Sequence, residues 1–176
     1  PFLVGRLGAA MVRGLQGSSS GEIAPDHVAA TLKHFAGYAG TTGGRNRSPY
    51  PNGLRHLLDT EIPPFRHVIN TTHPASVMAA FNEIEGLPCH VNQWMLQELL
   101  RKRLGFEGLL VGDYQGLNLV RRYQKIGTSD ADVGRMALKA GLQLELPNAF
   151  GFKHLQKLVQ KGDVQEPDIN TAVRQV

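Results

Sequence analysis

The stretch Gly108-Leu109-Leu110-Val111-Gly112-Asp113-Tyr114 places one carboxylate and one aromatic ring at the end of a short apolar run. An apolar run of strand length that ends in a polar residue is typical of a buried parallel strand. In a sheet covered by helices, ligands gather at the carboxyl ends of the strands, where Asp113 is expected to lie. From the pattern alone, Asp113 is either a catalytic residue or a cap or turn residue.

Three more strands are predicted, at residues 28–35, 75–81 and 142–146. Lys33 and His34 stand at the end of the first of these strands, and Glu145 stands in the last. Successive strand ends are separated by about one strand-and-helix unit, which argues for parallel strands joined by right-handed crossovers.

Apolar residues at helical spacing predict the elements between the strands. The first helix carries Leu3, Leu7, Ala10 and Met11 and ends at Gly17. The other predicted helices are marked by these positions: Leu54, Leu57 and Leu58; Phe65, Val68 and Ile69 after Pro63-Pro64; Leu96, Leu99, Leu100 and Leu104 after a capping Asn92; Val133, Met136, Ala137 and Ala140 after a capping Ser129; Phe152, Leu155, Leu158 and Val159; and Ile169, Val173 and Val176 after Pro167. Pro63-Pro64 either breaks its helix or starts a second segment. Residues 36–53 are predicted to form a long loop.

The predicted fold class is α/β, as about half of a (β/α)8 TIM-barrel-like domain: roughly four βα units plus a preceding helix. A complete barrel of this kind takes ~250 residues. The sequence begins inside a helical pattern, so we expect further sequence upstream. Val77, Leu110 and Leu144 are expected to face the inside of the barrel, where residues 1–176 alone would leave them uncovered.

Composition excludes several classes of protein. Hydrophobic residues make up 41% of the chain and charged residues 19%, which is ordinary for a globular domain. The net charge of +4 is spread along the chain without interleaved aromatic residues, so no nucleic-acid partner is predicted. The single cysteine, Cys89, excludes an internal disulfide and a cysteine-based metal site. No apolar stretch approaches the ~18 residues of a membrane span, so no membrane partner is predicted.

A set of motifs, in order along nearly the whole chain, resembles the family 3 glycoside hydrolases, the β-glucosidase and β-xylosidase group. The motifs are Lys33-His34-Phe35-Ala36-Gly37, Gly43-Gly44-Arg45-Asn46, Pro63-Pro64-Phe65, the run from Ser76 to Gly86, Leu104-Gly105-Phe106-Glu107-Gly108, and Asp113-Tyr114. The resemblance implies a segment of the family's amino-terminal (β/α)8-like barrel, with no cofactor and no metal. In the family an α/β sandwich domain follows this barrel, and we expect the function to need further barrel strands and that domain.

The resemblance also implies roles for individual residues. Asp113 matches the family's catalytic nucleophile. The residues that match its sugar-binding positions are Lys33, His34, Arg45, Met78, Phe81 and Tyr114. Three positions depart from the common pattern: Gly112 stands where the family often has Ser or Ala, Phe81 where many members have Tyr, and Gln143 where Asp is common.

A retaining glycosidase needs a second carboxyl group, ~5–5.5 Å from the nucleophile, as its acid/base. Glu83, Glu85 and Glu145 are the candidates by motif position, although each is also typical of a hydrogen-bond anchor. One branch of the family carries an Asp/His pair in the loop after the Lys-His strand. Residues 36–53 contain neither Asp nor His. The resemblance is therefore to the branch whose acid/base lies in the downstream domain.

The leading hypothesis is hydrolysis of terminal non-reducing β-D-glucosyl residues from a β-linked oligosaccharide or glycoside. A β-xylosidase is the alternative within the family, and a catalytically silent sugar-binding fragment is the alternative outside enzyme function. A barrel enzyme for phosphorylated ligands is disfavoured because no strand is followed by a Gly-rich phosphate loop. These motifs do not specify the sugar, the linkage or the compartment.

Overall fold

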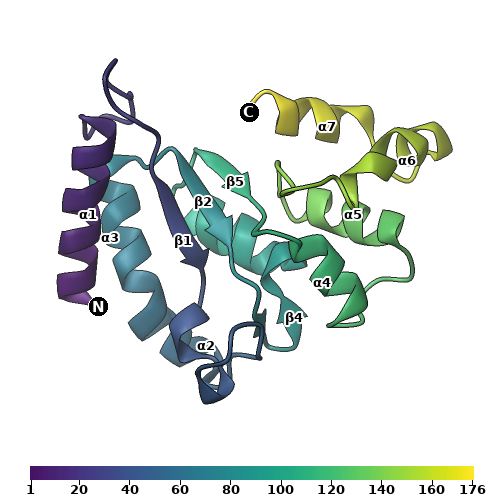
Figure 1. The fold of residues 1–176 in the computed structure, drawn as a ribbon, viewed down its shortest axis with the longest axis horizontal. Coiled ribbons are helices and arrows are strands. Elements are labelled where there is room, and N and C mark those ends of the chain that lie inside the picture. Colours follow the sequence, from purple (N-terminus) through teal and green to yellow (C-terminus); the bar gives the residue numbers. More distant parts are fainter.

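The computed structural model describes residues 1–176 as an α/β structure built on three parallel strands (Figure 1). The strands are β1 (Thr31–Phe35), β2 (Ser76–Ala79) and β5 (Leu109–Val111), hydrogen-bonded in the order β1-β2-β5. Each strand lies inside a range that the sequence predicts. A two-stranded hairpin of β3 (Glu83–Ile84) and β4 (Leu87–Pro88), which the sequence does not predict, follows β2.

Helices connect the strands, as the alternating pattern predicts. They are α1 (Phe2–Gln16), α2 (Gly53–His56), the π-helical turn η3 (Leu57–Glu61), α3 (Ile62–Thr72), the π-helical segment η5 (Trp94–Arg103), α4 (Gly116–Arg122), α5 (Asp130–Lys139), α6 (Leu155–Lys161) and α7 (Glu166–Val173). Short 3₁₀ turns are η1 (Tyr38–Gly40), η2 (Thr42–Gly44), η4 (Cys89–Val91) and η6 (Phe152–His154). Helices α1 and α3 lie side by side next to β1, whereas α4 to α7 follow beyond β5 (Figure 1).

The predicted fourth strand is reduced to a single parallel bridge between Val111 and Leu144. The Gly112 N–H donates to the Leu144 carbonyl at 2.8 Å, as a ladder requires. One step earlier, however, the Leu110 N–H donates to the side-chain Oε1 of Gln143 at 2.6 Å. Because a side chain takes the place of a backbone carbonyl there, the ladder is interrupted.

Helix α1 buries its small residues and exposes its large ones. Ala9 and Val12 are buried, whereas Leu3, Leu7 and Met11 are 62–69% exposed. Gly5 explains the choice of face, because a Cβ at that position would lie 3.1 Å from the Cβ of His67 on α3. Small residues let the two helix backbones approach closely, so the spacing of large apolar residues predicts the helix but not its buried face.

The Pro63-Pro64 pair starts a segment and does not interrupt the helical path. α2, η3 and α3 follow one another without a loop from Gly53 to Thr72, and the prolines occupy the first turn of α3. Proline is tolerated there because the first-turn N–H groups lack intrahelical partners. Two predicted caps are also confirmed: Asn92 accepts from the Met95 N–H at 3.1 Å, and Ser129 accepts from the Asp132 N–H at 3.1 Å.

The main core lies on the helix-covered face of the sheet. Val77 of β2 and Leu110 of β5 are fully buried in it, together with leucines of η5 such as Leu96 and Leu100. The expectation that Val77 and Leu110 lack a covering wall is therefore wrong. Side chains alternate along a strand, so their neighbours Met78 and Val111 belong to the other face. No helix is both long and apolar enough to cross a bilayer.

Candidate functional site

The carboxyl ends of β1 and β5 bring together two of the residues singled out in the sequence. The Nε2 atom of His34, at the end of β1, lies 3.3 Å from Oδ2 of Asp113, just after β5. Both side chains are largely buried, with exposed fractions of 20% and 15%. Seventy-nine residues of chain separate the two side chains, so the fold creates this contact.

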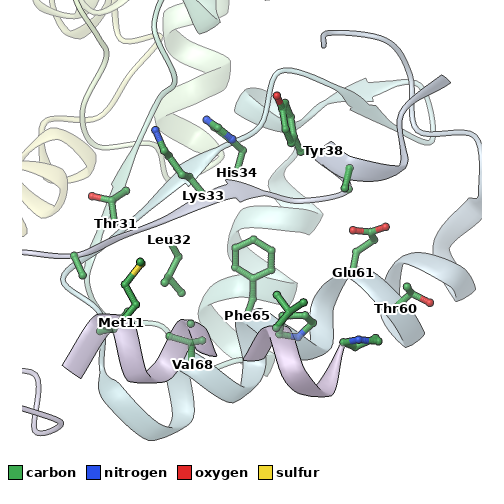
Figure 2. A pocket seen from close by; sticks show the side chains of 18 of the residues that line it. Met11, Thr31, Leu32, Lys33, His34, Tyr38, Thr60, Glu61, Phe65 and Val68 are labelled. Atoms are coloured by element: carbon green, nitrogen blue, oxygen red, sulfur yellow. The ribbon is translucent and has the colours of Figure 1, made fainter. Parts of the chain in front are cut away.

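An irregularity in β1 turns two consecutive side chains toward this end of the sheet. The register of β1 with β2 shifts between Leu32 and Phe35. Figure 2 shows Lys33 and His34 projecting from one side of β1, whereas Leu32 points to the other side, toward Phe65. The ring of His34 also contacts Tyr38, with 4.9 Å between the ring centroids.

Burial sets the charge of His34. It lowers the pKa of the imidazole, the Asp113 carboxylate opposes this effect, and the ammonium group of Lys33 adds to it. At neutral pH the imidazole is therefore uncharged, and a nitrogen that carries hydrogen can donate to the carboxylate or to a ligand hydroxyl.

Two further contacts fix Asp113. Its Oδ1 accepts a hydrogen bond from the Tyr114 N–H at 2.7 Å, and its own N–H donates to Nε2 of His90 at 3.0 Å. The Tyr114 side chain is 61% exposed. The backbone of Tyr114 therefore orients the carboxylate, and its ring is free to meet a ligand.

The predicted cationic residues do not pair with Asp113. Lys33 and Arg45 are exposed, and the structure records no ion pair for either of them. A different arginine of the same loop reaches a predicted site residue, since the guanidinium carbon of Arg47 lies 5.5 Å from the ring centroid of Phe81.

Met78 and Phe81 lie at the end of β2, between the other two strands. Met78 is half-buried and pairs in register with Val111. Phe81 is 9% exposed and stacks on the ring of His90, with 6.0 Å between centroids and an interplanar angle of 25°. Because His90 also accepts from the Asp113 N–H, His90 connects Phe81 to Asp113.

His90 is the site residue that sequence reasoning missed. It is 1% exposed and lies in η4, after the hairpin that was also not predicted. Burial lowers the pKa of its imidazole to about 4. The only signal in the sequence is a histidine shortly after the motif that ends at Gly86, and a lone histidine of this kind is more often part of a core than of a site.

None of the three glutamates that are candidates for the acid/base contacts Asp113. Glu145 is 9% exposed and accepts hydrogen bonds from the backbone N–H groups of Gly151 and Phe152 at 2.9–3.1 Å. Burial raises the pKa of the Glu145 carboxyl, although these backbone donors oppose the effect. Glu83 belongs to β3, and Glu85 is exposed in the turn of the hairpin. No carboxyl group is among the hydrogen-bond or ion-pair partners of Asp113.

A cavity of about 650 Å³ lies on the other side of β1, between α1 and α3. Its walls include Met11, Leu32, Phe65 and Val68 (Figure 2), and Asp113 is not among them. Lys33 and His34 are also among its lining residues, so this largely apolar groove borders the polar end of β1 but does not reach Asp113. No group of three or more His, Cys, Asp and Glu side chains is arranged to hold a metal ion.

Comparisons with known proteins match the chain throughout. The family model "Glycosyl hydrolase family 3 N terminal domain" matches residues 1–176. A β-xylosidase of Formosa agariphila is 34% identical over 83% of the chain, and a periplasmic β-glucosidase of Salmonella typhimurium is 29% identical over 99% of it. Among solved structures, a mutant β-glucosidase of Listeria innocua in complex with laminaribiose superposes with a TM-score of 0.92, at 28% identity over 98% of the chain and 24% of the Listeria protein.

The chain spans about a fifth of the length of these curated relatives, 20% of the Formosa protein and 22% of the Salmonella protein. The resemblance inferred from the motifs is confirmed, and the homologues are glycoside hydrolases.

Proposed function

Since this chain belongs to glycosyl hydrolase family 3, we propose that it supplies the nucleophile and part of the first sugar subsite of a retaining exo-β-glucosidase. The reaction is hydrolysis of terminal non-reducing β-D-glucosyl residues. Asp113 is the nucleophile in this proposal. Lys33, His34, Arg45, Met78, Phe81 and Tyr114 form the wall of the subsite that receives the sugar.

The observation that supports this proposal most directly is the contact between Nε2 of His34 and Oδ2 of Asp113, at 3.3 Å. A nucleophile must lie next to groups that hold the sugar, because the anomeric carbon has to stand close to the attacking oxygen. His34 provides such a group at the correct end of the sheet. The uncharged imidazole and the exposed ammonium of Lys33 both can donate to sugar hydroxyl oxygens.

The proposed reaction proceeds by double displacement. The ionised Asp113 carboxylate attacks the anomeric carbon, the glycosidic bond breaks, and a covalent glycosyl-enzyme forms. Water then attacks the same carbon and releases the sugar with the carboxylate regenerated. The second carboxyl group protonates the departing oxygen in the first step and deprotonates the water in the second.

We propose that this acid/base comes from outside residues 1–176, in a domain that follows the barrel. The structure supports the proposal in two ways. Glu145 is occupied by the backbone N–H groups of Gly151 and Phe152. No glutamate contacts Asp113.

The proposal extends to the fold. The parallel sheet with helices over one face is consistent with about half of a (β/α)8 barrel, roughly four βα units plus the preceding helix. The bridge at Leu144 then counts as the last strand of this half. Residues 1–176 are accordingly proposed to be part of the family's amino-terminal barrel domain.

A β-xylosidase is the second candidate, favoured by the relative from Formosa agariphila, which carries that name. A silent sugar-binding role is the alternative outside catalysis. A trapping experiment on the protein expressed from its full reading frame distinguishes the β-glucosidase, the β-xylosidase and the silent sugar-binding role. The protein is incubated with activated 2-deoxy-2-fluoro derivatives of β-glucose and of β-xylose, and the labelled peptide is mapped.

We expect faster inactivation by the glucose derivative and a label on Asp113. Faster inactivation by the xylose derivative would favour the β-xylosidase. No label from either reagent, with sugar binding retained, would favour the silent binding role. A label on another carboxyl group would overturn the assignment of the nucleophile.

A further inference from the structure

We propose that His90 is a positioning residue for the nucleophile: it holds the backbone N–H of Asp113 without contacting the sugar. The inference rests on the proposed function, because it takes Asp113 as the attacking group. It begins from a contact that joins two distant segments. The Asp113 N–H donates to Nε2 of His90 at 3.0 Å, and 23 residues of chain separate the two.

The imidazole spans the gap between two strand ends. While Nε2 accepts from Asp113 after β5, the backbone of Ala80, after β2, acts on the ring as an acceptor and raises its pKa. An uncharged imidazole has one donor and one acceptor nitrogen, so Nδ1 carries the hydrogen when Nε2 accepts. The donor therefore faces Ala80, and the acceptor faces Asp113.

The chain around the imidazole is shaped to fit it. A Cβ added at Gly116 would lie 2.1 Å from Nε2 of His90, inside any permitted contact. A Cβ at Gly112 would meet the ring at 3.4 Å, an ordinary van der Waals distance. The turn from Asp113 to Gly116 thus closes over Nε2, the nitrogen that accepts from Asp113. Of the two glycines, Gly116 is the one that must lack a side chain.

The bond to His90 matters because it holds the peptide of Asp113 between two anchored neighbours. The Gly112 N–H donates to the Leu144 carbonyl at 2.8 Å, and the Gln115 N–H donates to the Leu146 carbonyl at 2.9 Å. The side-chain partners of Asp113 are the Tyr114 N–H, in the same turn, and His34. Without the bond to His90, the Asp113 peptide can rotate between the two anchors at Gly112 and Gln115, and the carboxylate moves with it. A displacement of about 1 Å at a reacting group can reduce a rate roughly 100-fold.

A histidine that only fills the core would predict a different outcome. In that case any apolar side chain of similar volume would keep the chemistry, and only stability would change. The two roles separate because a glutamine places an acceptor oxygen near the position of Nε2, whereas a leucine fills space and accepts nothing.

The test uses the protein expressed from its full reading frame and the fluoroglycoside that labels it. The rate constant of inactivation and the dissociation constant of the reagent are measured for wild type, His90→Leu and His90→Gln. We expect His90→Leu to lower the inactivation rate constant about 10- to 100-fold, with the dissociation constant within about threefold of wild type. His90→Gln should recover most of the rate. Leu99→Ala, in the core of η5, is the control for lost stability, and its folded fraction should react as wild type does.

If His90→Leu does not fold, Gly116→Ala provides the same test, because its added methyl group displaces the imidazole without removing it. It should reproduce the loss of rate. Wild-type rates in folded His90→Leu or Gly116→Ala would overturn this inference and leave the proposed function intact. A wild-type label on a carboxyl group other than Asp113 would instead overturn the proposed function, and this inference with it.

Discussion

Asp113 is held by contacts that its amide analogue can keep, which makes the residue a clean target for substitution. Asp113→Asn retains an oxygen for the Tyr114 N–H, found at 2.7 Å from Oδ1, and leaves the backbone bond to His90 in place. The neutral amide cannot attack the anomeric carbon. We expect kcat to fall by several orders of magnitude, with an unchanged thermal unfolding midpoint. The exposed Asp163→Asn is the control, and near-wild-type turnover in Asp113→Asn would contradict the assignment.

Lys33 is exposed and makes no ion pair, so its contribution is expected to appear only with a sugar bound. A charged hydrogen bond contributes about 1.5–3 kcal/mol. Lys33→Ala should accordingly lower kcat/KM roughly 10- to 100-fold without changing stability. The exposed Lys157→Ala on α6 controls for the loss of one positive charge. Equal kcat/KM values in the two variants would mean that Lys33 is only a solvated lysine.

His90 should make stability depend on pH in a definite direction. Burial lowers the pKa of its imidazole from 6.5 to about 4 in the folded protein. Between these values the unfolded chain binds a proton that the folded protein does not. Stability therefore falls as the pH is lowered from about 6.5 to 4, by up to about 3 kcal/mol.

The measurement is the free energy of unfolding in urea, at a series of pH values, for wild type and His90→Gln. Glu145 and His34 also have shifted pKa values, but both variants share them, so the difference between the two curves isolates His90. We expect the two curves to converge as the pH falls toward 4. A constant difference across this range would show that His90 titrates normally.

At the scale of elements, the side chain of Gln143 interrupts the predicted fourth strand and makes hydrogen bonds in its place. Its Oε1 accepts from the Leu110 N–H at 2.6 Å and from Arg101 at 3.1 Å. Arg101 also donates to the carbonyl groups of Phe106 and Gly108. One amide oxygen therefore joins the helical segment η5 to β5 and to the chain before Leu144. Gln143 therefore has a structural role at this position.

Gln143→Ala should leave the Leu110 N–H without its acceptor and cost about 1–3 kcal/mol of stability. The test is urea unfolding, with the exposed Gln160→Ala on α6 as control. An unfolding free energy equal to that of the control would mean that a backbone carbonyl or water replaces the lost oxygen.

Local signals account for what the sequence predicted at this scale. The caps at Asn92 and Ser129 are confirmed because a cap depends on a few neighbouring residues. The reduced fourth strand was not predictable, since it depends on a side chain whose partner Arg101 lies 42 residues away. His90 was missed for the same reason, because its role follows from contacts across the fold rather than from a pattern.

The candidate site, too, was predicted only in part from the sequence. The motifs named Asp113 and His34, and the fold places them in contact. The motifs also named Lys33 and Arg45 as sugar-binding residues, and the structure shows both exposed and without an ion pair. Side chains this long adjust to a ligand, so their arrangement around a sugar is not encoded in the chain alone.

At the scale of the whole molecule, the protein presents apolar surface and an open strand edge together. Phe2, Leu3, Val4, Leu7 and Met11 of α1 are 62–80% exposed. Strand β1 pairs only with β2, so its other edge has free backbone groups. Soluble monomers rarely expose contiguous apolar patches of this kind, and an open edge is a template for pairing with another chain.

We therefore expect residues 1–176, expressed by themselves, to self-associate at micromolar concentration, as measured by size-exclusion chromatography with light scattering. Leu3→Lys with Leu7→Lys should weaken the association, because the two changes place charge in the middle of the α1 patch. Gln156→Lys on the exposed side of α6 is the matched control and should not. The proposed nucleophile, Asp113, has no carboxyl group in contact with it, so turnover of unactivated cellobiose should be negligible. A monomer that unfolds cooperatively and hydrolyses cellobiose would contradict both expectations, and Glu83, Glu85 and Glu145 would then be tested as its acid/base.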